Sequence, residues 1–456
     1  MSLKVDLDLV TKYNRPGPRY TSYPTAPHFS PEVTAQDWDQ AIEKNNISAE
    51  RDLSLYLHLP FCDTLCYFCG CTNIITRNPE HVEKYLQHLH RELEMFADKM
   101  NPDRKVVQQH FGGGTPTYLE PDQIRRLGEK LQVLFPRAAD AEIGCEIDPR
   151  GLTKEHLKAL REVGFNRSSI GVQDFNPQVQ QAVNRINSES MLREIVGWHD
   201  ELGFSSLNLD LIYGLPFQTP KSFEKTLQTI LSFKPDRLAV FSYAHVPWMK
   251  PNQKLIKESD LPTPEVKLEM LKMIIETLTS SGYVYIGMDH FARVNDELAI
   301  AQREKTLQRN FQGYSTKAGV DIYAFGMSSI SQVDQIYAQN TKDINQYYEH
   351  ISKGELPLEK GYILTAEDSL RRTVIMRLMC DLELNYDKMG SQLDLDFRSH
   401  FAKELTNLNE FEQDELILLN ETGLTVTDEG RLFIRNIAMT FDAYLGEGEG
   451  RFSKTI

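Results

Sequence analysis

Short apolar runs alternate with helix-forming segments along the first half of the chain. The runs are rich in β-branched and aromatic residues, and the segments between them repeat apolar residues every three or four positions, as amphipathic helices do. The six runs span residues 53–61, 106–112, 142–149, 167–175, 206–216 and 237–245. Because strands that alternate with helices at this spacing form right-handed βαβ crossovers, the pattern predicts a parallel α/β sheet. Six units fit an open (β/α)6 barrel or a doubly wound sheet.

Helix-start signals mark the segments between the runs. Asn78 and Glu120 each precede a proline, and Thr153, Ser188 and Thr219 are typical N-cap or first-turn residues. Each signal follows one apolar run and opens a stretch of the chain that has helical character. We therefore expect a helix to begin at each of these positions.

Polar residues or glycines stand at the carboxyl end of every run. They are Cys62, the Gly112-Gly113-Gly114-Thr115 turn, Glu146, Asp148, Gln173, Asp174, Asp210, Tyr243 and His245. A single polar strand end means little, because loops follow strands. Ligands of α/β proteins bind at this edge of the sheet, however, so the succession of such ends favours a barrel with a binding site there.

The alternation weakens after residue 250. A long amphipathic helix is expected at about 264–282, and residues 283–291 and 320–330 are expected to add strands that flank the sheet. From about Thr365 the pattern predicts helices over 369–380, 396–405 and 428–445, with a short strand at 424–427. This part is expected to form a small helical, winged-helix-like domain.

The net charge of the chain disfavours some classes of binding partner. The 456 residues include 50 Lys and Arg against 65 Asp and Glu, which gives a net charge of −15. Nucleic acids and anionic membranes attract positive surfaces, so neither is expected as a general partner, and DNA contact by the C-terminal domain is disfavoured. No stretch approaches the ~18–20 apolar residues of a membrane span, and the first residues carry acids where a signal peptide would be apolar. A cytoplasmic location is therefore expected.

Four of the 6 cysteines fall within ten residues, at Cys62, Cys66, Cys69 and Cys71. A disulfide pair is disfavoured in a reducing compartment, and a zinc site normally uses two separated pairs of ligands. Core cysteines would not be expected to cluster so tightly. An iron–sulfur cluster held by Cys62, Cys66 and Cys69 is the interpretation that remains.

The spacing C-x3-C-x2-C after a strand resembles the motif of radical S-adenosylmethionine (SAM) enzymes. In those enzymes three thiolates leave one iron of a [4Fe–4S] cluster open to SAM, and reductive cleavage of SAM yields a radical that abstracts hydrogen. The glycine turn at 112–115 supports the resemblance, because backbone without side chains can approach the SAM amino group closely.

Over nearly its whole length the chain resembles the oxygen-independent coproporphyrinogen III oxidases, a radical SAM family of haem biosynthesis. The motifs that carry this resemblance lie at residues 17–25, 62–71, 112–118, 146–150, 171–175, 210–216, 287–292 and 309–314. It implies an incomplete (β/α)6 TIM-like radical SAM barrel at 51–362. An N-terminal arm at 1–50 would contribute to the substrate site, and a mostly helical C-terminal domain would occupy 363–456.

The resemblance also implies the chemistry. Two propionates of coproporphyrinogen III would be oxidatively decarboxylated to vinyl groups, giving protoporphyrinogen IX, with a [4Fe–4S] cluster and two SAM molecules as cofactors. The expected contacts of the cluster-bound SAM are Tyr56, Gly113, Glu146 and Ile330. Those of the second SAM are Phe68, Gly114, Thr115, Gln173, Arg185, Asp210 and Ala244.

A catalytic role is expected for Glu146 and, again by resemblance, for Phe311 and Gln312 in the substrate pocket. Cys71 is the further candidate. Related haem-chaperone-like proteins generally lack this fourth cysteine and the N-terminal segment, so we expect Cys71 near the substrate and not at the cluster.

The N-terminal segment addresses the charge of an anionic tetrapyrrole substrate. Residues 1–25 contain four Lys or Arg and two Asp, so 4 − 2 = +2 locally. Arg15 and Arg19, held by the stiff Pro16-Gly17-Pro18, are expected to bind propionates. A surface arm that packs on the barrel is the alternative.

Other functions stay open on the sequence alone. They are a haem-binding chaperone on the same fold, a tRNA-modifying radical SAM enzyme, which the acidic charge disfavours, and a plain zinc protein. The expected partner is a reducing electron donor such as a flavodoxin-type protein, and the expected oligomeric state is a monomer.

Overall fold

The structure, a computed structural model, describes residues 3–445, 452, 454 and 455, and the chain divides into two compact units. Unit 1 takes its residues from Met1–His28, Thr263–Ala318 and Leu364–Ile456, and unit 2 from Phe29–Pro262 and Gly319–Ile363. The domain boundaries expected at residues 50 and 362 stay a prediction. Within the described residues, no helix is long and apolar enough to cross a membrane.

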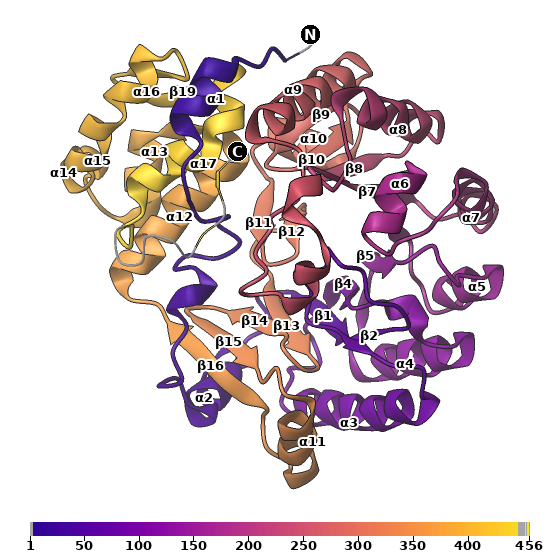
Figure 1. Cartoon of the computed structure of the whole chain (residues 1–456). Helices are drawn as coiled ribbons and strands as arrows, with labels where there is room; N and C mark the ends of the chain where they lie inside the picture. The colour runs from indigo at the N-terminus through magenta and orange to yellow at the C-terminus, as the bar shows by residue number, and fades with distance from the viewer. Residues whose placement is uncertain (1–2, 446–451, 453, 456) are drawn as a thin grey trace. The chain divides into compact units, whose positions relative to one another are not determined.

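The strands that unit 2 contributes to the main sheet follow the order β16-β15-β14-β13-β1-β4-β5-β6-β7-β8 (Figure 1). Its parallel strands are β1 (Leu53–Leu59), β4 (Val106–Gly113), β5 (Arg137–Ile147), β6 (Arg167–Gln173), β7 (Ser206–Tyr213), β8 (Arg237–Ser242) and β13 (Asp321–Phe325). The antiparallel additions are β14 (Ile330–Val333), β15 (Ile336–Asn340) and β16 (Leu358–Ile363).

The order of the parallel strands decides between the two predicted windings. From β1 through β4 to β8 the strands run across the sheet in chain order, whereas a doubly wound sheet reverses direction at a switch point. The barrel-type winding predicted from the sequence is therefore confirmed. β1 lies between β4 and β13 and does not pair with β8, so the parallel strands do not close into a complete barrel.

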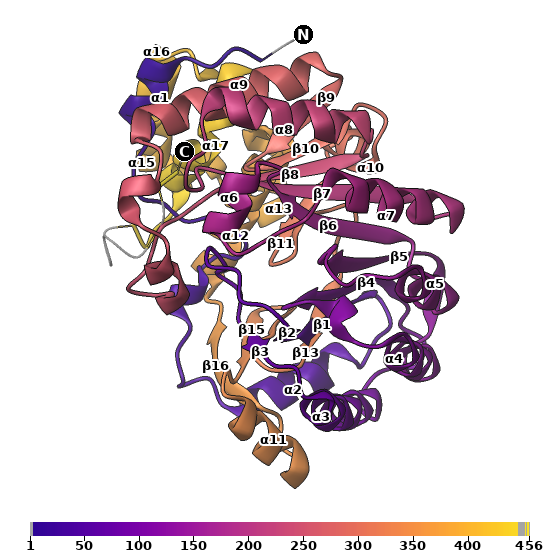
Figure 2. The same cartoon turned by 45° about the vertical axis from the view of Figure 1, so that its right-hand side comes forward.

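Helices cover one side of these strands (Figure 2), and they begin where the sequence predicts. They are α3 (Pro79–Ala97), α4 (Pro121–Leu134), α5 (Lys154–Glu162), α7 (Glu189–Glu201) and α8 (Pro220–Ser232). The Asn78, Ser188 and Thr219 side chains accept backbone N–H groups of the first turn of α3, α7 and α8. The remaining elements of unit 2 are α2 (Ala35–Asn45), β2 (Phe61–Cys62), β3 (Ile74–Ile75), η2 (Pro116–Tyr118), α6 (Pro177–Ala182), η3 (Pro251–Leu255), η4 (Glu258–Asp260) and α11 (Ile344–Lys353).

Strand β1 shows how the core is made. Leu53, Leu55, Leu57 and Leu59 are each at most 1% exposed, as expected for a parallel strand covered on both faces. Tyr56, in the middle of the strand, is the one residue of β1 that is only partly buried. The central strand therefore keeps one polar side chain accessible.

A buried carboxyl group ties helix α3 to the turn before β14. Glu92 has no exposed surface, and its Oε2 accepts the Gly326 N–H and the Tyr347 hydroxyl, both at 2.7 Å. Its Oε1 accepts Asn340 Nδ2 at 2.9 Å. Burial raises the pKa of Glu92 to about 7, although these hydrogen bonds lower it. The turn that leads into Ile330 is thus fixed by groups that donate to one carboxyl.

Unit 1 combines three stretches of the chain. Its elements are α1 (Leu7–Tyr13), η1 (Ala26–His28), α9 (Pro264–Ser280), β9 (Tyr283–Gly287), β10 (His290–Arg293), α10 (Glu297–Arg303), β11 (Gln308–Asn310) and β12 (Gly313–Ser315). From residue 364 they are α12 (Ala366–Asp381), β17 (Glu383–Asn385), α13 (Tyr386–Leu393), α14 (Phe397–His400), α15 (Ala402–Asn407), α16 (Asn409–Gln413), β18 (Ile417–Asn420), β19 (Gly423–Val426), η5 (Glu429–Phe433), α17 (Ile434–Ala438) and η6 (Met439–Phe441). Strands β17, β19 and β18 form a small antiparallel sheet, and the winged-helix-like character expected for this region stays a prediction.

Some boundaries predicted for unit 1 are wrong. Residues 283–291 form the antiparallel pair β9 and β10, because the chain reverses at Met288, whose φ is 59°. The helix expected over 396–405 is divided into α14 and α15, and the one expected over 428–445 into η5, α17 and η6. Short apolar stretches do not reveal where a helix bends to follow its neighbours.

Two buried arginines hold the N-terminal segment of unit 1. Arg435 Nε donates to the Pro18 carbonyl at 3.0 Å, and Arg309 Nε donates to the Tyr20 carbonyl at 3.1 Å. Both side chains therefore recognise the backbone of the segment and not its side chains. Since Arg435 and Arg309 are only 4% and 7% exposed, these contacts belong to the interior of unit 1.

The N-terminal segment also contacts the far end of the described chain. The Thr455 N–H donates to the Arg15 carbonyl at 2.8 Å, and the Thr455 hydroxyl donates to the Tyr13 carbonyl at 2.9 Å. Pro16 and Lys454 form an antiparallel bridge. Unit 1 thus joins residues that lie more than 400 positions apart in the sequence.

We expect Glu92→Gln to destabilise unit 2. The amide can place its oxygen toward Gly326 and Tyr347, but its NH2 group then faces the Asn340 donor, so about 1–3 kcal/mol should be lost. The check is thermal unfolding of the apoprotein, with Glu80→Gln at the exposed start of the same helix as the control. Equal melting temperatures for the two variants would contradict the role of Glu92.

Candidate functional site

The cysteine loop connects β2 to β3 and is fastened by side-chain amides. Asn252 Nδ2 donates to the carbonyls of Tyr67 at 3.0 Å and Cys69 at 2.9 Å. Asn184 Nδ2 donates to the Leu65 carbonyl at 2.8 Å. Because these bonds take up backbone carbonyls, they fix the path of the loop and leave its thiols free for other contacts.

Two guanidinium groups surround Cys66. Arg150 Nη2 lies 3.1 Å and Arg185 Nη1 lies 3.6 Å from Cys66 Sγ. Both also bind Asp148 Oδ2, at 2.6 Å and 2.8 Å. Burial alone would raise the pKa of Asp148, but Arg185 and Arg150 hold it below its ordinary value. The Cys66 thiol therefore lies in a positive environment anchored by one carboxylate.

The other thiols of the loop differ in their surroundings. Cys62 Sγ lies 3.3 Å from Thr115 Oγ1, and burial raises the pKa of Cys62 to about 12. Cys69 Sγ accepts Asn73 Nδ2 at 3.4 Å, and a hydrogen bond from Cys71 lowers the pKa of Cys69 to about 6. Cys71 itself is exposed. The protein alone thus favours a thiolate at Cys69 and opposes one at Cys62, where a bound cation would be needed.

The donor set fits an iron–sulfur cluster. Within the described residues, no three His, Cys, Asp or Glu side chains are arranged to hold a single metal ion. A cubane cluster does not require that arrangement, because each cysteine binds a different iron. Three thiols on one anchored loop, with two cations beside Cys66, are the donors and the charge that such a cluster needs.

The glycine turn at the end of β4 passes close to the start of the cysteine loop. Gly114 N donates to the Leu59 carbonyl at 2.9 Å. A Cβ at Gly114 would lie 2.5 Å from the Pro60 oxygen, and Gly113 has a φ of 117°, which favours glycine. The turn therefore depends on glycine for both its conformation and its approach to the chain before Cys62.

Three residues expected at the cluster-bound SAM lie together. Glu146, at the end of β5, accepts the Gly113 N–H at 3.3 Å through Oε2, and its Oε1 lies 3.3 Å from His110 Nε2. The His110 ring stacks on Tyr56 with centroids 6.1 Å apart. The Glu146 side chain is 45% exposed, so its carboxylate remains available to a ligand.

Ile330 is the fourth residue expected at the cluster-bound SAM, and its turn is connected to Tyr56 through the side chain of His58. Ile330 opens β14, and Ser328 Oγ, two positions earlier, lies 3.3 Å from His58 Nε2. His58 Nδ1 lies 3.3 Å from the Tyr56 hydroxyl. A short polar chain thus connects the strand that carries Tyr56 to the turn that carries Ile330.

Asp210 on β7 carries a carboxyl group that two polar side chains hold in place. Asn208 Nδ2 donates to its Oδ1 at 2.6 Å, and the Ser169 hydroxyl donates to its Oδ2 at 3.1 Å. Burial, followed by repulsion from Glu146, raises the pKa of Asp210 to about 6, although both hydrogen bonds lower it. The carboxyl can therefore change its charge slightly below neutral pH.

Gln173 and Arg185 leave polar atoms unsatisfied. Gln173 ends β6 at a register shift and has a φ of 69°, which turns its side chain out of the strand pattern. Among the described residues, neither Gln173 Oε1 nor Arg185 Nε has a hydrogen-bond partner, although both atoms are buried. Such atoms are costly unless a ligand or water satisfies them, so this corner of the site fits a polar cofactor.

Phe68 and Ala244 lie at an apolar cluster next to the loop. Phe68 packs against a group that includes Val183 and Tyr243, and Gln253 Nε2 donates to its carbonyl at 3.1 Å. Ala244 follows Tyr243 and is exposed. Together with Thr115 beside Cys62, these two residues complete the positions predicted for SAM in unit 2.

Four of the predicted site residues belong to unit 1. They are Arg15, Arg19, Phe311 and Gln312. Phe311 and Gln312 form the turn between β11 and β12, and Arg19 forms an ion pair with Asp289. Their roles at the substrate stay predictions, as does the role of Cys71.

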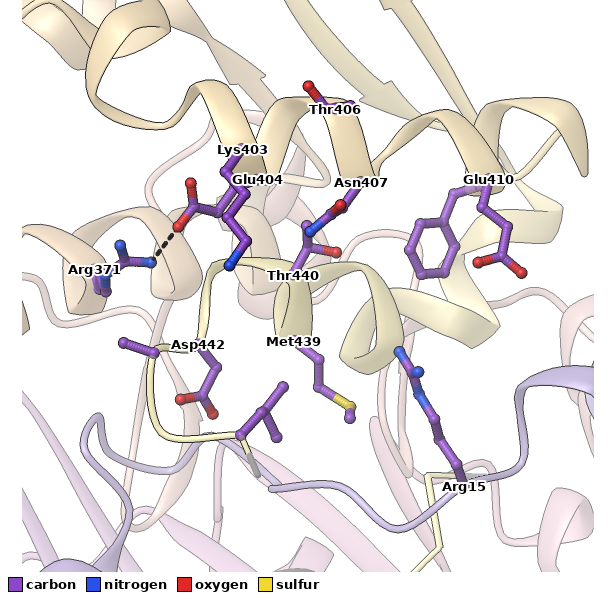
Figure 3. A pocket seen from close by; sticks show the side chains of 13 residues that line it. Arg15, Arg371, Lys403, Glu404, Thr406, Asn407, Glu410, Met439, Thr440 and Asp442 are labelled. Carbon is purple, nitrogen blue, oxygen red and sulfur yellow. Dashed lines mark hydrogen bonds and ion pairs between the residues drawn. The ribbon is translucent and has the colours of Figure 1, made fainter. Parts of the chain in front are cut away.

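Arg15 lines a cavity of about 850 Å³ within unit 1 (Figure 3). Figure 3 shows its guanidinium group pointing into the cavity from the N-terminal segment. Helices α12 and α15 line other parts of it, and there Arg371 Nη1 and Glu404 Oε1 form an ion pair at 2.9 Å. Arg15 and Arg19 therefore have different neighbours, although the sequence suggested one shared role.

The sequence did not reveal several residues that shape the site. Asp148 stands at a polar strand end and Arg150 two positions later, but nothing in the sequence pairs either of them with Cys66 or Arg185. Asn252 lies where the strand pattern has already ended, and nothing in its neighbourhood marks it. A side chain that binds backbone carbonyls of a distant loop leaves no periodic signal.

Comparisons with protein families cover both parts of the chain. The model of the radical SAM superfamily matches residues 56–230, and the model described as the HemN C-terminal domain matches residues 364–433. The first match contains the cysteine loop, the glycine turn, Glu146 and Asp210.

Individual relatives match over nearly the full length. The chain is 49% identical to the oxygen-independent coproporphyrinogen III oxidase of Escherichia coli K12 over 440 residues, which is 96% of this chain and 95% of the relative. It is 44% identical to that of Helicobacter pylori J99, covering 99% of each. The solved structure of the Escherichia coli radical SAM coproporphyrinogen III oxidase superposes with a TM-score of 0.93 at 47% identity, covering 98% of this chain and 100% of that one.

We expect Gly114→Ala to displace the chain that leads into Cys62. The added Cβ would press on the Pro60 and Phe61 oxygens, and overpacking of this kind costs about 1–3 kcal/mol. Both the melting temperature of the apoprotein and the iron content after anaerobic reconstitution should fall. Gly70→Ala, where a Cβ would meet nothing within 4 Å, is the control from the cysteine loop. Wild-type values for Gly114→Ala would refute the importance of this close approach.

Proposed function

This chain belongs to the oxygen-independent coproporphyrinogen III oxidases, a family of radical SAM enzymes, and we propose that it decarboxylates coproporphyrinogen III at the site around its cysteine loop. Two propionates of the substrate become vinyl groups, and the product is protoporphyrinogen IX. The observation that carries this proposal is the extent of the similarity. It covers the N-terminal segment and the C-terminal region as well as the stretch that all radical SAM enzymes share.

The cofactors are a [4Fe–4S] cluster and SAM. Cys62, Cys66 and Cys69 are the residues that would hold the cluster, while the exposed Cys71 stays outside it. When bound, these groups supply reductive cleavage of SAM and with it the abstraction of a hydrogen atom from the substrate. The residues of the chain bind and orient the reactants and keep competing reactions away.

Two sets of residues are proposed to bind two SAM molecules. Tyr56, Gly113, Glu146 and Ile330 would contact the SAM at the cluster, supported by the contacts that link the first three and by the His58 connection to the turn before Ile330. The second SAM would lie against Phe68, Gly114, Thr115, Gln173, Arg185, Asp210 and Ala244. Buried atoms without partners at Gln173 and Arg185 support this second position.

The charge of the substrate explains the proposed roles in unit 1. To become a vinyl group, each propionate would lose one hydrogen atom to the SAM-derived radical, one electron to a one-electron acceptor, and its ionised carboxylate as CO2. Arg19, now paired with Asp289, would exchange this carboxylate for a propionate, and Arg15 would bind a second one. Phe311, Gln312 and Cys71 are proposed to lie near the reacting side chain.

The remaining partners are proposed on chemical grounds. The cluster needs a low-potential one-electron donor, such as a flavodoxin-type protein. Free thiols at every cysteine of the chain favour a reducing compartment, and we propose the cytoplasm. We also propose a monomer, because one chain carries every residue assigned to the reaction.

The proposed function is tested by an anaerobic assay with reconstituted enzyme, SAM, a reductant and coproporphyrinogen III, in which chromatography detects the vinyl product. We expect product from the wild type and neither product nor SAM cleavage from Cys66→Ala. Cys71→Ala should cleave SAM but form less product. SAM cleavage by the wild type without any vinyl product would overturn the assignment of the substrate.

We expect SAM binding to weaken in mild acid through Asp210. Because burial raises the pKa of Asp210 to about 6, the carboxyl is ionised above this pH and neutral below it. If the ionised form accepts SAM hydroxyl groups, affinity should fall about tenfold between pH 7 and pH 5.

Equilibrium binding of SAM to the reconstituted enzyme measures this effect. Asp210→Asn should bind weakly at both pH values, whereas the exposed control Asp200→Asn should behave as wild type. An unchanged pH dependence in Asp210→Asn would exclude Asp210 as its source.

A further inference from the structure

The Asp148-Pro149-Arg150 segment holds an arginine that neither SAM site requires. Arg150 Nε donates to Asp148 Oδ1 at 3.0 Å, and Nη2 donates to Oδ2 at 2.6 Å, so the guanidinium group is bound by both carboxylate oxygens. Arg150 Nη1 donates to the Asn184 carbonyl at 3.2 Å. The side chains of Arg150 and Asp148 are 18% and 11% exposed. Few orientations remain open to a guanidinium group held in this way.

The fixed group presents a charged N–H to one thiol. Arg150 Nη2 lies 3.1 Å from Cys66 Sγ, within hydrogen-bond distance for sulfur. Asn184, whose carbonyl binds Arg150, donates through its own side chain to the Leu65 carbonyl at 2.8 Å. The Arg150 guanidinium therefore reaches Cys66 directly through its sulfur and indirectly through the backbone just before it.

We propose that Arg150, oriented by Asp148, is a positioning residue that donates a charged hydrogen bond to the Cys66 thiolate and makes the cluster easier to reduce. The inference rests on the proposed function, because it needs a cluster at Cys66. Hydrogen bonds to cysteine sulfur and nearby charge are among the factors that set the potentials of iron–sulfur clusters. Reduction adds a negative charge to the cluster, which an adjacent guanidinium stabilises.

Arg185 does not replace Arg150 in this role. It lies farther from the sulfur, at 3.6 Å, and its Nη2 is bound to the Gly171 carbonyl. It also belongs to the residues proposed for the second SAM. Arg150, by contrast, makes its polar contacts to Asp148, Asn184 and Cys66.

A purely structural role is the alternative. The ion pair with Asp148 could merely fasten the end of β5, and its loss would then lower the stability of the protein without altering the electronic properties of the cluster. The reduction potential separates the two roles, because it responds to charge and hydrogen bonding at the sulfur and not to the stability of the fold.

The experiment compares Arg150→Gln with wild type in the reconstituted holoenzyme without SAM, by EPR-monitored redox titration. We expect a one-electron reduction equilibrium about tenfold less favourable, which is a shift of about 59 mV to lower potential. Arg150→Lys keeps the charge but loses the fork, so it should lie between the two. Arg193→Gln removes an exposed arginine from α7 and should leave the potential unchanged.

The outcomes are distinct. Arg150→Gln with wild-type iron content and an unchanged potential would overturn the inference. If Arg150→Gln holds no cluster while its apoprotein melts like the wild type, the potential of the Arg150→Lys holoenzyme decides: a lowered potential supports the inference and an unchanged one overturns it. If Arg150→Gln does not fold, Arg150→Lys decides, and an unchanged potential there contradicts the proposal. A wild-type protein that binds no iron–sulfur cluster would instead refute the proposed function, and the inference with it.

Discussion

Thiolates that lie close together in one short loop repel one another, and at Cys66 two cations offset this repulsion. Arg150 and Arg185 both donate to Cys66, and Asp148 keeps both guanidinium groups in place. Their charge limits the cost of a buried anion, which would otherwise be high. This local balance of charge matters for function. It depends on the ends of the parallel strands, on the glycine turn and on the amide contacts to the loop, which keep the charged groups in place.

The central fold could be predicted because its determinants are local. β-Branched and apolar runs, capping side chains and prolines at helix starts each act within a few residues, and the strands and helices of unit 2 begin close to where these signals place them. The antiparallel strands β15 and β16, and the reversal at Met288, could not be predicted in the same way. Their residues adopt these conformations because of pairing with other strands, which a single sequence does not display.

Site residues were predictable to the extent that they stand in spaced motifs. The spacing of Cys62, Cys66 and Cys69 and the glycines of the turn carry a chemical meaning that can be recognised without coordinates. Glu146 and Asp210 were candidates through the polar ends of the apolar runs and through the family resemblance, although the structure places Asp210 in the middle of β7. Asn252 could not be identified, since it acts through carbonyls of a distant loop. The two arginines of the N-terminal segment could not be told apart, because only the folded chain shows that Arg19 has a carboxylate partner and that Arg15 lines a cavity.

The contact of Thr455 with Tyr13 and Arg15 affects the order in which the two units can form during synthesis. Every residue of unit 2 has been translated by Ile363, so its sheet can assemble while the ribosome is still adding the C-terminal region. The first helix cannot complete its contacts at that stage, because the residues that bind its end are translated more than 400 positions later. The cysteine loop can therefore be in place before the segment that carries Arg15 and Arg19 has found its final position.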